Sequence, residues 1–160
     1  MTACWRSLFM WVGAGAVALS SLTGLAAPRP QSSERDVEMV IRRWADAFAT
    51  LDGGRSASVY AADARLWGTI AQEPAVGLDA IRAYFDSGRQ RAKARRVVIG
   101  DHATRVYGTT AVSSGRYDFH SVLLDGTSTV RRARFSLTFV QRGGQWLIVD
   151  HHSSEVPPVP

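Results

Sequence analysis

The segment from Thr127 to Ser154 constrains the fold most strongly, because two strand-like runs flank a tight turn within it. Residues 131–140 form the first run, Gly143-Gly144 suits a two-residue hairpin loop, and residues 146–154 form the second run. Arginine, aspartate and histidine stand among large apolar residues in these runs, and such groups are rarely buried on a strand unless they are paired or used. The segment therefore predicts a β-hairpin that forms the wall of a small pocket with polar groups at its mouth.

The first 27 residues have the features of a secretory signal peptide. Arg6 supplies a positive charge, residues 8–25 are almost wholly apolar or small, and Ala26-Ala27 provides small residues for cleavage. The apolar stretch is close to the ~20 residues that a membrane span needs, so an uncleaved N-terminal membrane anchor is the alternative. We expect a cleaved signal peptide over residues 1–27, a secreted or periplasmic protein, and no stable membrane insertion after cleavage.

The remaining chain predicts a linker over residues 28–32, one domain over 33–156 and a short tail over 157–160. About 133 of the 160 residues remain after cleavage, enough for a single core. The one cysteine, Cys4, lies within the signal peptide, so the mature domain has no disulfide and no cysteine-based metal site. Arginines cluster in the run 89–96, which we interpret as the solvated end of a helix rather than a nucleic-acid site.

Helical patterns come first along the domain and strand patterns follow. Apolar residues recur at helical spacing from Val37 to Leu51 and again over residues 78–90, and a short helix is expected over 55–62. Strand-like runs are expected at residues 64–70, 97–101, 104–107, 111–124, 130–140 and 145–153. Helices followed by a series of antiparallel strands predict an α+β fold.

The two turns predict which side chains share a face of the sheet. If Asp125-Gly126 and Gly143-Gly144 are both two-residue loops, Leu124 faces Thr127 and Arg142 faces Gln145. Alternation then gives one face a set of large apolar residues, which we place under the helices as a cup with a polar mouth. A single β-bulge would exchange residues between the two faces. The members of the cup face that matter for a site are Arg116, Asp118, His120, Phe135, Leu137, Phe139, Ile148, Asp150 and His152.

Several of these segments resemble a known family. Leu66-Trp67-Gly68, residues 76–85, residues 133–136 and residues 146–154 are similar to the SgcJ/EcaC family of the SnoaL-like, nuclear transport factor 2-like superfamily. This superfamily also contains the association domain of calcium/calmodulin-dependent protein kinase II. The resemblance implies a cystatin-like cone, in which N-terminal helices pack on a strongly curved sheet, and a homodimer formed through the outer face of that sheet. Superfamily members include isomerases, cyclases, dehydratases and proteins without catalytic activity, so the fold alone does not imply a function.

The cup predicts acid/base groups in an apolar setting, where burial shifts the pKa values of carboxylates and imidazoles. Asp118 and His152 are the candidate catalytic pair. An alternative polar row on the opposite face consists of Tyr117, Arg134 and Ser153. Buried, this row could hold a carboxylate or phosphate, and in a dimer it would be a polar interface contact. The candidate ligand-binding residues are Trp67, Tyr84, Arg116, His120, Phe135 and Asp150.

The histidines do not predict a metal site. His151 and His152 are neighbours on a strand and so point to opposite faces, and His120 and His152 lie too far apart on the predicted sheet to share an ion. The sequence also has no glycine-rich dinucleotide loop and no cysteine pair, so no cofactor is expected. We favour an exported, dimer-forming domain that binds a small organic ligand in a hydrophobic cone. The alternative is a cofactor-free isomerase, cyclase or dehydratase-like enzyme that uses histidine and aspartate.

Overall fold

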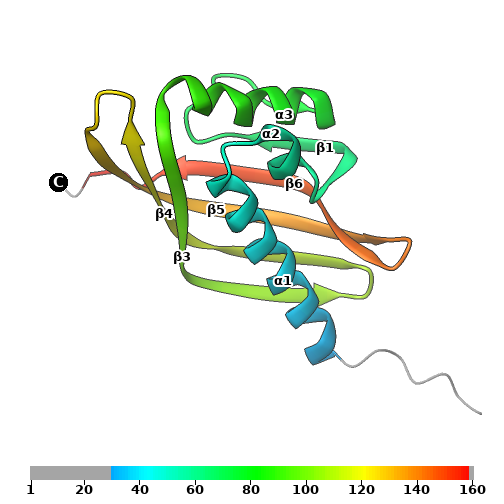
Figure 1. The fold of residues 1–160 in the computed structure, drawn as a ribbon. Coiled ribbons are helices and arrows are strands. Elements are labelled where there is room, and N and C mark those ends of the chain that lie inside the picture. The colour runs from blue at the N-terminus through cyan, green and yellow to red at the C-terminus, as the bar shows by residue number, and fades with distance from the viewer. Residues whose placement is uncertain (1–29, 159–160) are drawn as a thin grey trace, which may run out of the picture.

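The computed structural model describes residues 30–158, with side chains from Ser33 onward; the predicted signal peptide lies outside this range. No helix in this part of the chain is long and apolar enough to cross a membrane. Two helices, a first strand, a third helix and then the long strands follow one another as predicted, and the two-residue strand β2 is additional (Figure 1). They are α1 (Pro30–Ala49), α2 (Gly53–Ala57), β1 (Tyr60–Trp67), β2 (Ala75–Val76), α3 (Leu78–Ser87), the 3-10 turn η1 (Gly88–Gln90), β3 (Ala92–Tyr107), β4 (Thr110–Leu123), β5 (Ser128–Arg142) and β6 (Gln145–Glu155).

Helix α1 forms because its apolar residues recur every three or four positions. Val37, Val40, Ile41 and Trp44 lie on one face and are at most 1% exposed. The helix begins at Pro30, inside the predicted linker, at a position where a missing N–H costs no hydrogen bond. Burying this face against the sheet holds the helix in place, since most helical stability in proteins comes from such packing.

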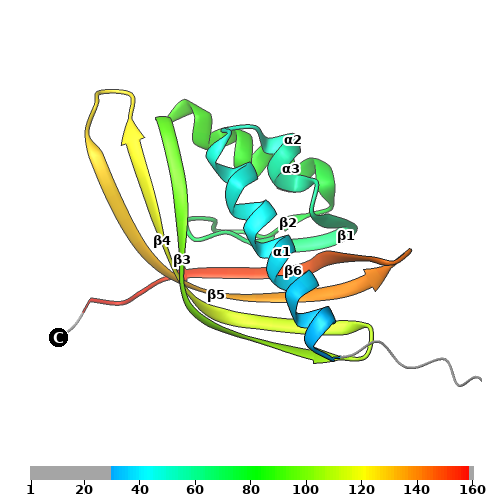
Figure 2. The same cartoon turned by 60° about the horizontal axis from the view of Figure 1, so that its bottom comes forward.

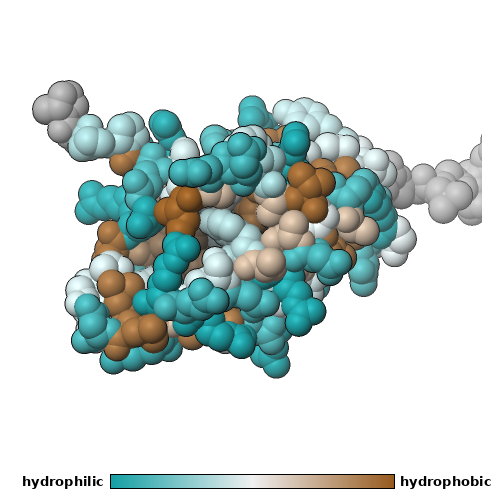
Figure 3. Space-filling view, turned by 90° about the horizontal axis from the view of Figure 1, so that it is seen from above, coloured by the Kyte–Doolittle hydropathy of each residue, from teal (hydrophilic) through white to brown (hydrophobic). Residues whose placement is uncertain are grey.

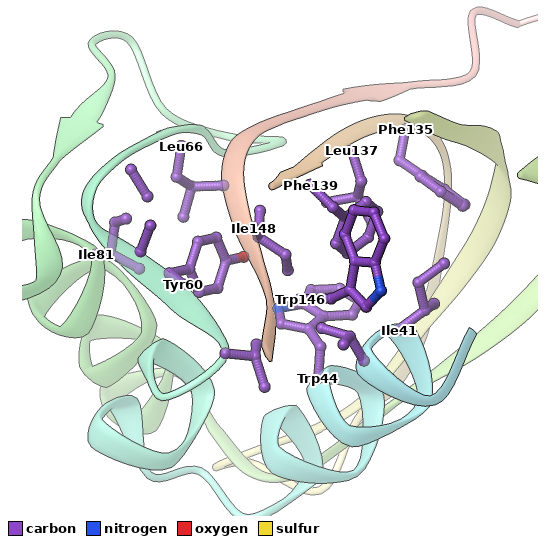
Figure 4. Packing of buried hydrophobic residues seen from close by; sticks show 14 of the residues in the cluster. Ile41, Trp44, Tyr60, Leu66, Ile81, Phe135, Leu137, Phe139, Trp146 and Ile148 are labelled. Carbon is purple, nitrogen blue, oxygen red and sulfur yellow. The ribbon is translucent and has the colours of Figure 1, made fainter. Parts of the chain in front are cut away.

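The six strands form one curved sheet with the order β2-β1-β6-β5-β4-β3, in which only the β1–β6 pair is parallel. The long strands bend around α1, and all three helices cover the same face (Figure 2). The core lies between α1 and the sheet, where Trp44 and Ile41 meet Phe139 and Ile148 (Figure 4). The predicted α+β cone is therefore confirmed.

Some element boundaries differ from the prediction. The short helix ends at Ala57 and the first strand already begins at Tyr60, because Val59, Tyr60 and Ala61 belong to the core. The two predicted strands at 97–101 and 104–107 are one strand, β3, that is irregular between Ile99 and His102.

The Asp125-Gly126 turn has a different register from the predicted one. Val122 pairs with Ser128, and the Leu123 N–H donates to the Thr127 carbonyl, so residues 124–126 form a three-residue loop. Gly126 has φ 94°, the left-handed conformation that such a loop requires. One extra loop residue exchanges the two faces of the strand before it. The predicted facing of β4 is therefore wrong: Tyr117 and Phe119 face the helices.

The Gly143-Gly144 turn is confirmed, but a bulge follows it. Both glycines have positive φ, and Arg142 pairs with Gln145 as predicted. Ile148 then pairs with Phe139 whereas Asp150 pairs with Thr138, so Val149 is an additional residue in β6. Beyond this bulge every side chain changes face. His151 therefore points inward and is 2% exposed, whereas His152 is exposed.

Candidate ligand-binding cavity

A cavity of about 210 Å³ lies inside the cone, at the end where α1 finishes and α3 crosses the sheet. It opens to solvent on a surface where hydrophilic side chains dominate and apolar ones show between them (Figure 3). The curved ends of β3, β4 and β5 form one side of it. Its lining residues are Trp44, Phe48, Leu66, Gly68, Thr69, Ile70, Tyr84, Phe85, Ser87, Gly88, Arg91, Ala92, Arg95, Phe119, Ser121, Leu123, Thr129, Arg131 and Ser153.

Aromatic rings make up much of the cavity wall. Phe48 lies at the centre of this group, with its ring centroid 5.9 Å from Trp44, 6.3 Å from Phe85 and 5.3 Å from Phe119. Such rings offer flat apolar surfaces to a ligand and prefer the tilted and edge-on packing seen here. The Tyr84 ring fits because Gly68 has no side chain: a Cβ there would lie 2.1 Å from the Tyr84 hydroxyl.

The polar groups of the lining are hydroxyls and guanidinium groups. The hydroxyls come from Thr69, Tyr84, Ser87, Ser121, Thr129 and Ser153, and those of Thr69 and Ser153 are hydrogen-bonded to each other. The cations are Arg91, Arg95 and Arg131. Within residues 33–158, the lining includes no aspartate, glutamate or histidine.

Arg95 is the buried cation of the cavity, with 9% of its surface exposed. Its Nε donates to the Phe48 carbonyl at 2.7 Å and its Nη1 to the Phe85 carbonyl at 3.1 Å, so it binds the last turns of both α1 and α3. A cation suits both positions because carbonyl groups accumulate at the C-terminal end of a helix. The guanidinium also lies 4.1 Å from the Phe48 ring centroid. Burial lowers the pKa of Arg95, but arginine remains a cation in proteins.

His151 lies below the cavity wall and is not part of the lining. Its Nδ1 is 2.7 Å from the Tyr60 hydroxyl, its Nε2 is 3.2 Å from the Tyr117 hydroxyl, and its ring packs edge-on against Trp44. Burial, with a smaller effect from His152, lowers the pKa of His151 to about 3. The ring is therefore neutral at pH 7, so one nitrogen donates to one tyrosine and the other nitrogen accepts from the other tyrosine.

The structure does not bring the predicted catalytic pair into the cone. Asp118 lies on the outer face of β4 because of the three-residue loop, and His152 lies outside because of the Val149 bulge. The same two register changes place Arg116, His120 and Asp150 outside the cavity. The predicted facing of these five residues is therefore wrong.

Of the other predicted site residues, some line the cavity and others lie in the core or on the surface. Tyr84 lies in the cavity wall, whereas Trp67 is 37% exposed and lies outside the cavity. Phe135 is buried in the core, where its ring stacks on Tyr117 at 4.8 Å. In the alternative row, Tyr117 and Ser153 face inward and Ser153 lines the cavity, but Arg134 is exposed and donates to Ser154.

The arginine that sequence reasoning missed is Arg95. It belongs to the run interpreted as a solvated helix end, but it lies on β3 and faces the cone. Arg95, Val97 and Ile99 stand at every second position, and this spacing is the signal that could have placed Arg95 on the apolar, inner face of a strand. No group of three or more histidine, cysteine, aspartate or glutamate residues with the spacing of a metal site occurs in the described part of the chain.

Comparison with known families gives a match over most of the chain. The family model of the SnoaL-like domain matches residues 37–160. A candidate calcium/calmodulin-dependent protein kinase II association domain from Xanthomonas campestris is 30% identical, with a TM-score of 0.72 over 78% of this chain and 89% of that one. No protein with a curated description matches the chain.

More distant structures share the fold. A nuclear transport factor 2-like superfamily protein from Salmonella enterica is 17% identical, with a TM-score of 0.73 over 81% of this chain and 95% of that one. A candidate dehydratase of the same superfamily from Streptomyces avermitilis is 14% identical, with a TM-score of 0.72 over 81% of this chain and 100% of that one. These two structures show the shared fold, and the match to the SnoaL-like family model confirms the predicted SnoaL-like family; the narrower SgcJ/EcaC assignment stays a prediction.

Proposed function

The chain belongs to the SnoaL-like domain family, and we propose that it serves as an exported, dimer-forming module that binds a small organic molecule in its cavity. The observation that carries this proposal is the cavity itself, about 210 Å³ with an aromatic wall and a set of hydroxyl and guanidinium groups. Binding sites for small molecules are typically concave and mostly apolar, with a few polar groups that orient the ligand.

Binding is favoured over acid/base catalysis because the described lining offers no carboxylate or imidazole. The nearest histidine, His151, is held by two tyrosines and has a pKa of about 3, so it is a weak base near neutral pH. The candidate dehydratases among the similar structures therefore share the fold with this chain, but they do not imply catalytic groups in its cavity.

Dimerisation through the outer face of the sheet is supported by the arrangement of layers. All three helices cover the inner face, and no element within residues 30–158 covers the outer face of the long strands (Figure 2). Val98 and Val130 on this face are 41% and 58% exposed. Exposed apolar residues on an uncovered sheet suit contact with a second copy. Export is supported by the charge and apolar pattern of residues 1–27.

A neutral aromatic probe tests the proposed binding. We expect 2-naphthol to bind the mature protein saturably in isothermal titration calorimetry at pH 7. Thr129→Trp should weaken this binding about tenfold or more, because an indole at this exposed lining position fills the cavity mouth.

Ser128→Trp is the matched control, because the neighbouring residue on a strand points to the opposite face. It should leave the affinity within about twofold. A folded protein that binds neither 2-naphthol nor its anionic counterpart, 2-naphthoate, would overturn the proposal. So would equal effects of the two tryptophan substitutions.

A further inference from the structure

The Arg95 guanidinium has one donor group without a partner. Its Nε and Nη1 are bound to the carbonyls of Phe48 and Phe85, but Nη2 is buried and has no hydrogen-bond acceptor among the described residues. Buried polar groups are nearly always hydrogen-bonded, and a charged donor left unsatisfied is costly. Nη2 itself is shielded from solvent, so the guanidinium, which lines the cavity, would have to turn slightly towards it for a ligand acceptor to satisfy this donor.

Gly88 makes room for the guanidinium at this place. A Cβ on Gly88 would lie 2.1 Å from Arg95 Nη1, so any side chain there would displace the group. The backbone of Gly88 has φ −65°, which every residue can adopt. The absence of a side chain at residue 88 thus serves the position of Arg95 rather than the conformation of the turn.

The surroundings of Arg95 add positive charge and neutral donors. Arg91 and Arg131 line the same cavity, although Arg131 also pairs with Glu155 at the rim. The nearby acid Asp86 is directed elsewhere: it accepts from the Gly53 N–H and lies within 4 Å of Arg82 and Arg89. Ser121 pairs with Arg95 across the strands and offers a hydroxyl.

We infer that the cavity takes a ring-containing organic acid, with its carboxylate on Arg95 Nη2 and its apolar ring against Phe48 and Phe119. This inference rests on the proposed function and specifies its ligand class. The ligand anion would replace the missing acceptor of Arg95, and its second oxygen could accept from Arg91 or Ser121. Hydrogen bonds to charged groups are strong in a partly dehydrated site, so the carboxylate should decide the ligand preference.

A pair of probes of nearly equal shape isolates the anion from the ring. We expect 2-naphthoate to bind the mature protein about tenfold to a hundredfold more tightly than 2-naphthol in calorimetry at pH 7. If both bind with equal affinity, the cavity binds small molecules but the anion subsite is refuted. If neither binds, the proposed function fails and this inference fails with it.

Substitutions then locate the subsite. Arg95→Met keeps the apolar stem and should abolish the preference for 2-naphthoate, whereas Arg96→Met, on the neighbouring residue of the strand, should leave it unchanged. Arg95 also binds the ends of two helices, so Gly88→Ala serves as a second variant that moves the guanidinium without removing the charge. It too should reduce the preference for the anion while 2-naphthol still binds. A full preference retained in a folded Arg95→Met protein, or in Gly88→Ala if Arg95→Met does not fold, would overturn the assignment.

Discussion

The buried His151 predicts that the domain loses stability in mild acid. Its pKa is about 3 in the folded protein and near 6.5 in the unfolded chain, so the unfolded state binds a proton first as the pH falls. The stability that the neutral ring contributes is therefore present above pH 6.5 and is lost as the pH falls from 6.5 towards 3. At pH 5 the difference from 6.5 is 1.5 units, which at about 1.36 kcal/mol per unit corresponds to a loss of about 2 kcal/mol relative to pH 8.

This loss is measurable by urea unfolding of the mature protein at pH 8 and pH 5. We expect the free energy of unfolding to fall by about 2 kcal/mol more in the unsubstituted protein than in His151→Gln, whose amide does not titrate. A substitution of the exposed His152, His152→Gln, is the matched control and should retain most of the difference. Equal pH dependence in the protein and in His151→Gln would show that the ring is not held neutral between Tyr60 and Tyr117, which would refute the inward assignment of His151.

Three further predictions concern export, dimerisation and the pairing of His102 on β3 with Glu38 on α1. The protein from its native host should have a mature N-terminus near Ala27 or Pro28 by mass spectrometry, and recovery of intact Met1 in the membrane fraction would contradict this. Light scattering at micromolar concentration should give the mass of a dimer that buries on the order of 1,600 Å² in total, and a strictly monomeric mass would contradict it. Burial lowers the pKa of His102, but hydrogen bonds to the Gly100 carbonyl and the Glu38 carboxylate outweigh this and raise it. Protonated His102 therefore stabilises the fold below pH 6.5, and this contribution is lost as the pH rises through its folded pKa. Glu38→Gln should lower the free energy of unfolding more at pH 6 than at pH 8, by under about 1 kcal/mol. An equal loss at both pH values would contradict this prediction.

Most of the fold follows from patterns that depend on neighbouring residues alone. The spacing of Val37, Ile41 and Trp44 predicts α1, and two consecutive glycines at 143 and 144 predict a turn that needs positive φ. The prediction of α1 holds because the face that the helical spacing defines is the face that is buried in the core. The resemblance of residues 66–68, 76–85, 133–136 and 146–154 to a known family added the curvature of the sheet, which no local pattern specifies.

The site was less predictable because it depends on register. Asp125-Gly126 suits a two-residue loop and a three-residue loop alike, since both place glycine at positive φ, and only the pairing of Val122 with Ser128 distinguishes them. Val149 has no feature that marks it as a bulge. Each of these changes exchanges two faces, and together they replace Asp118 and His152 by Tyr117 and His151 on the inner side. Arg95 was missed for a different reason, because a charged run resembles a solvated surface until its strand is known.

A bromine-labelled probe would show whether a ring-containing acid occupies the cavity beside Arg95. We would soak crystals of the mature protein with 6-bromo-2-naphthoate and locate the bromine by its anomalous scattering. We expect one strong peak inside the cavity, with the naphthalene ring between Phe48 and Phe119 and the carboxylate within hydrogen-bond distance of Arg95 Nη2. A probe that binds only on the outer face of the sheet, beside Asp118 and His152, or that gives no peak in the cavity at saturating concentration, would contradict it.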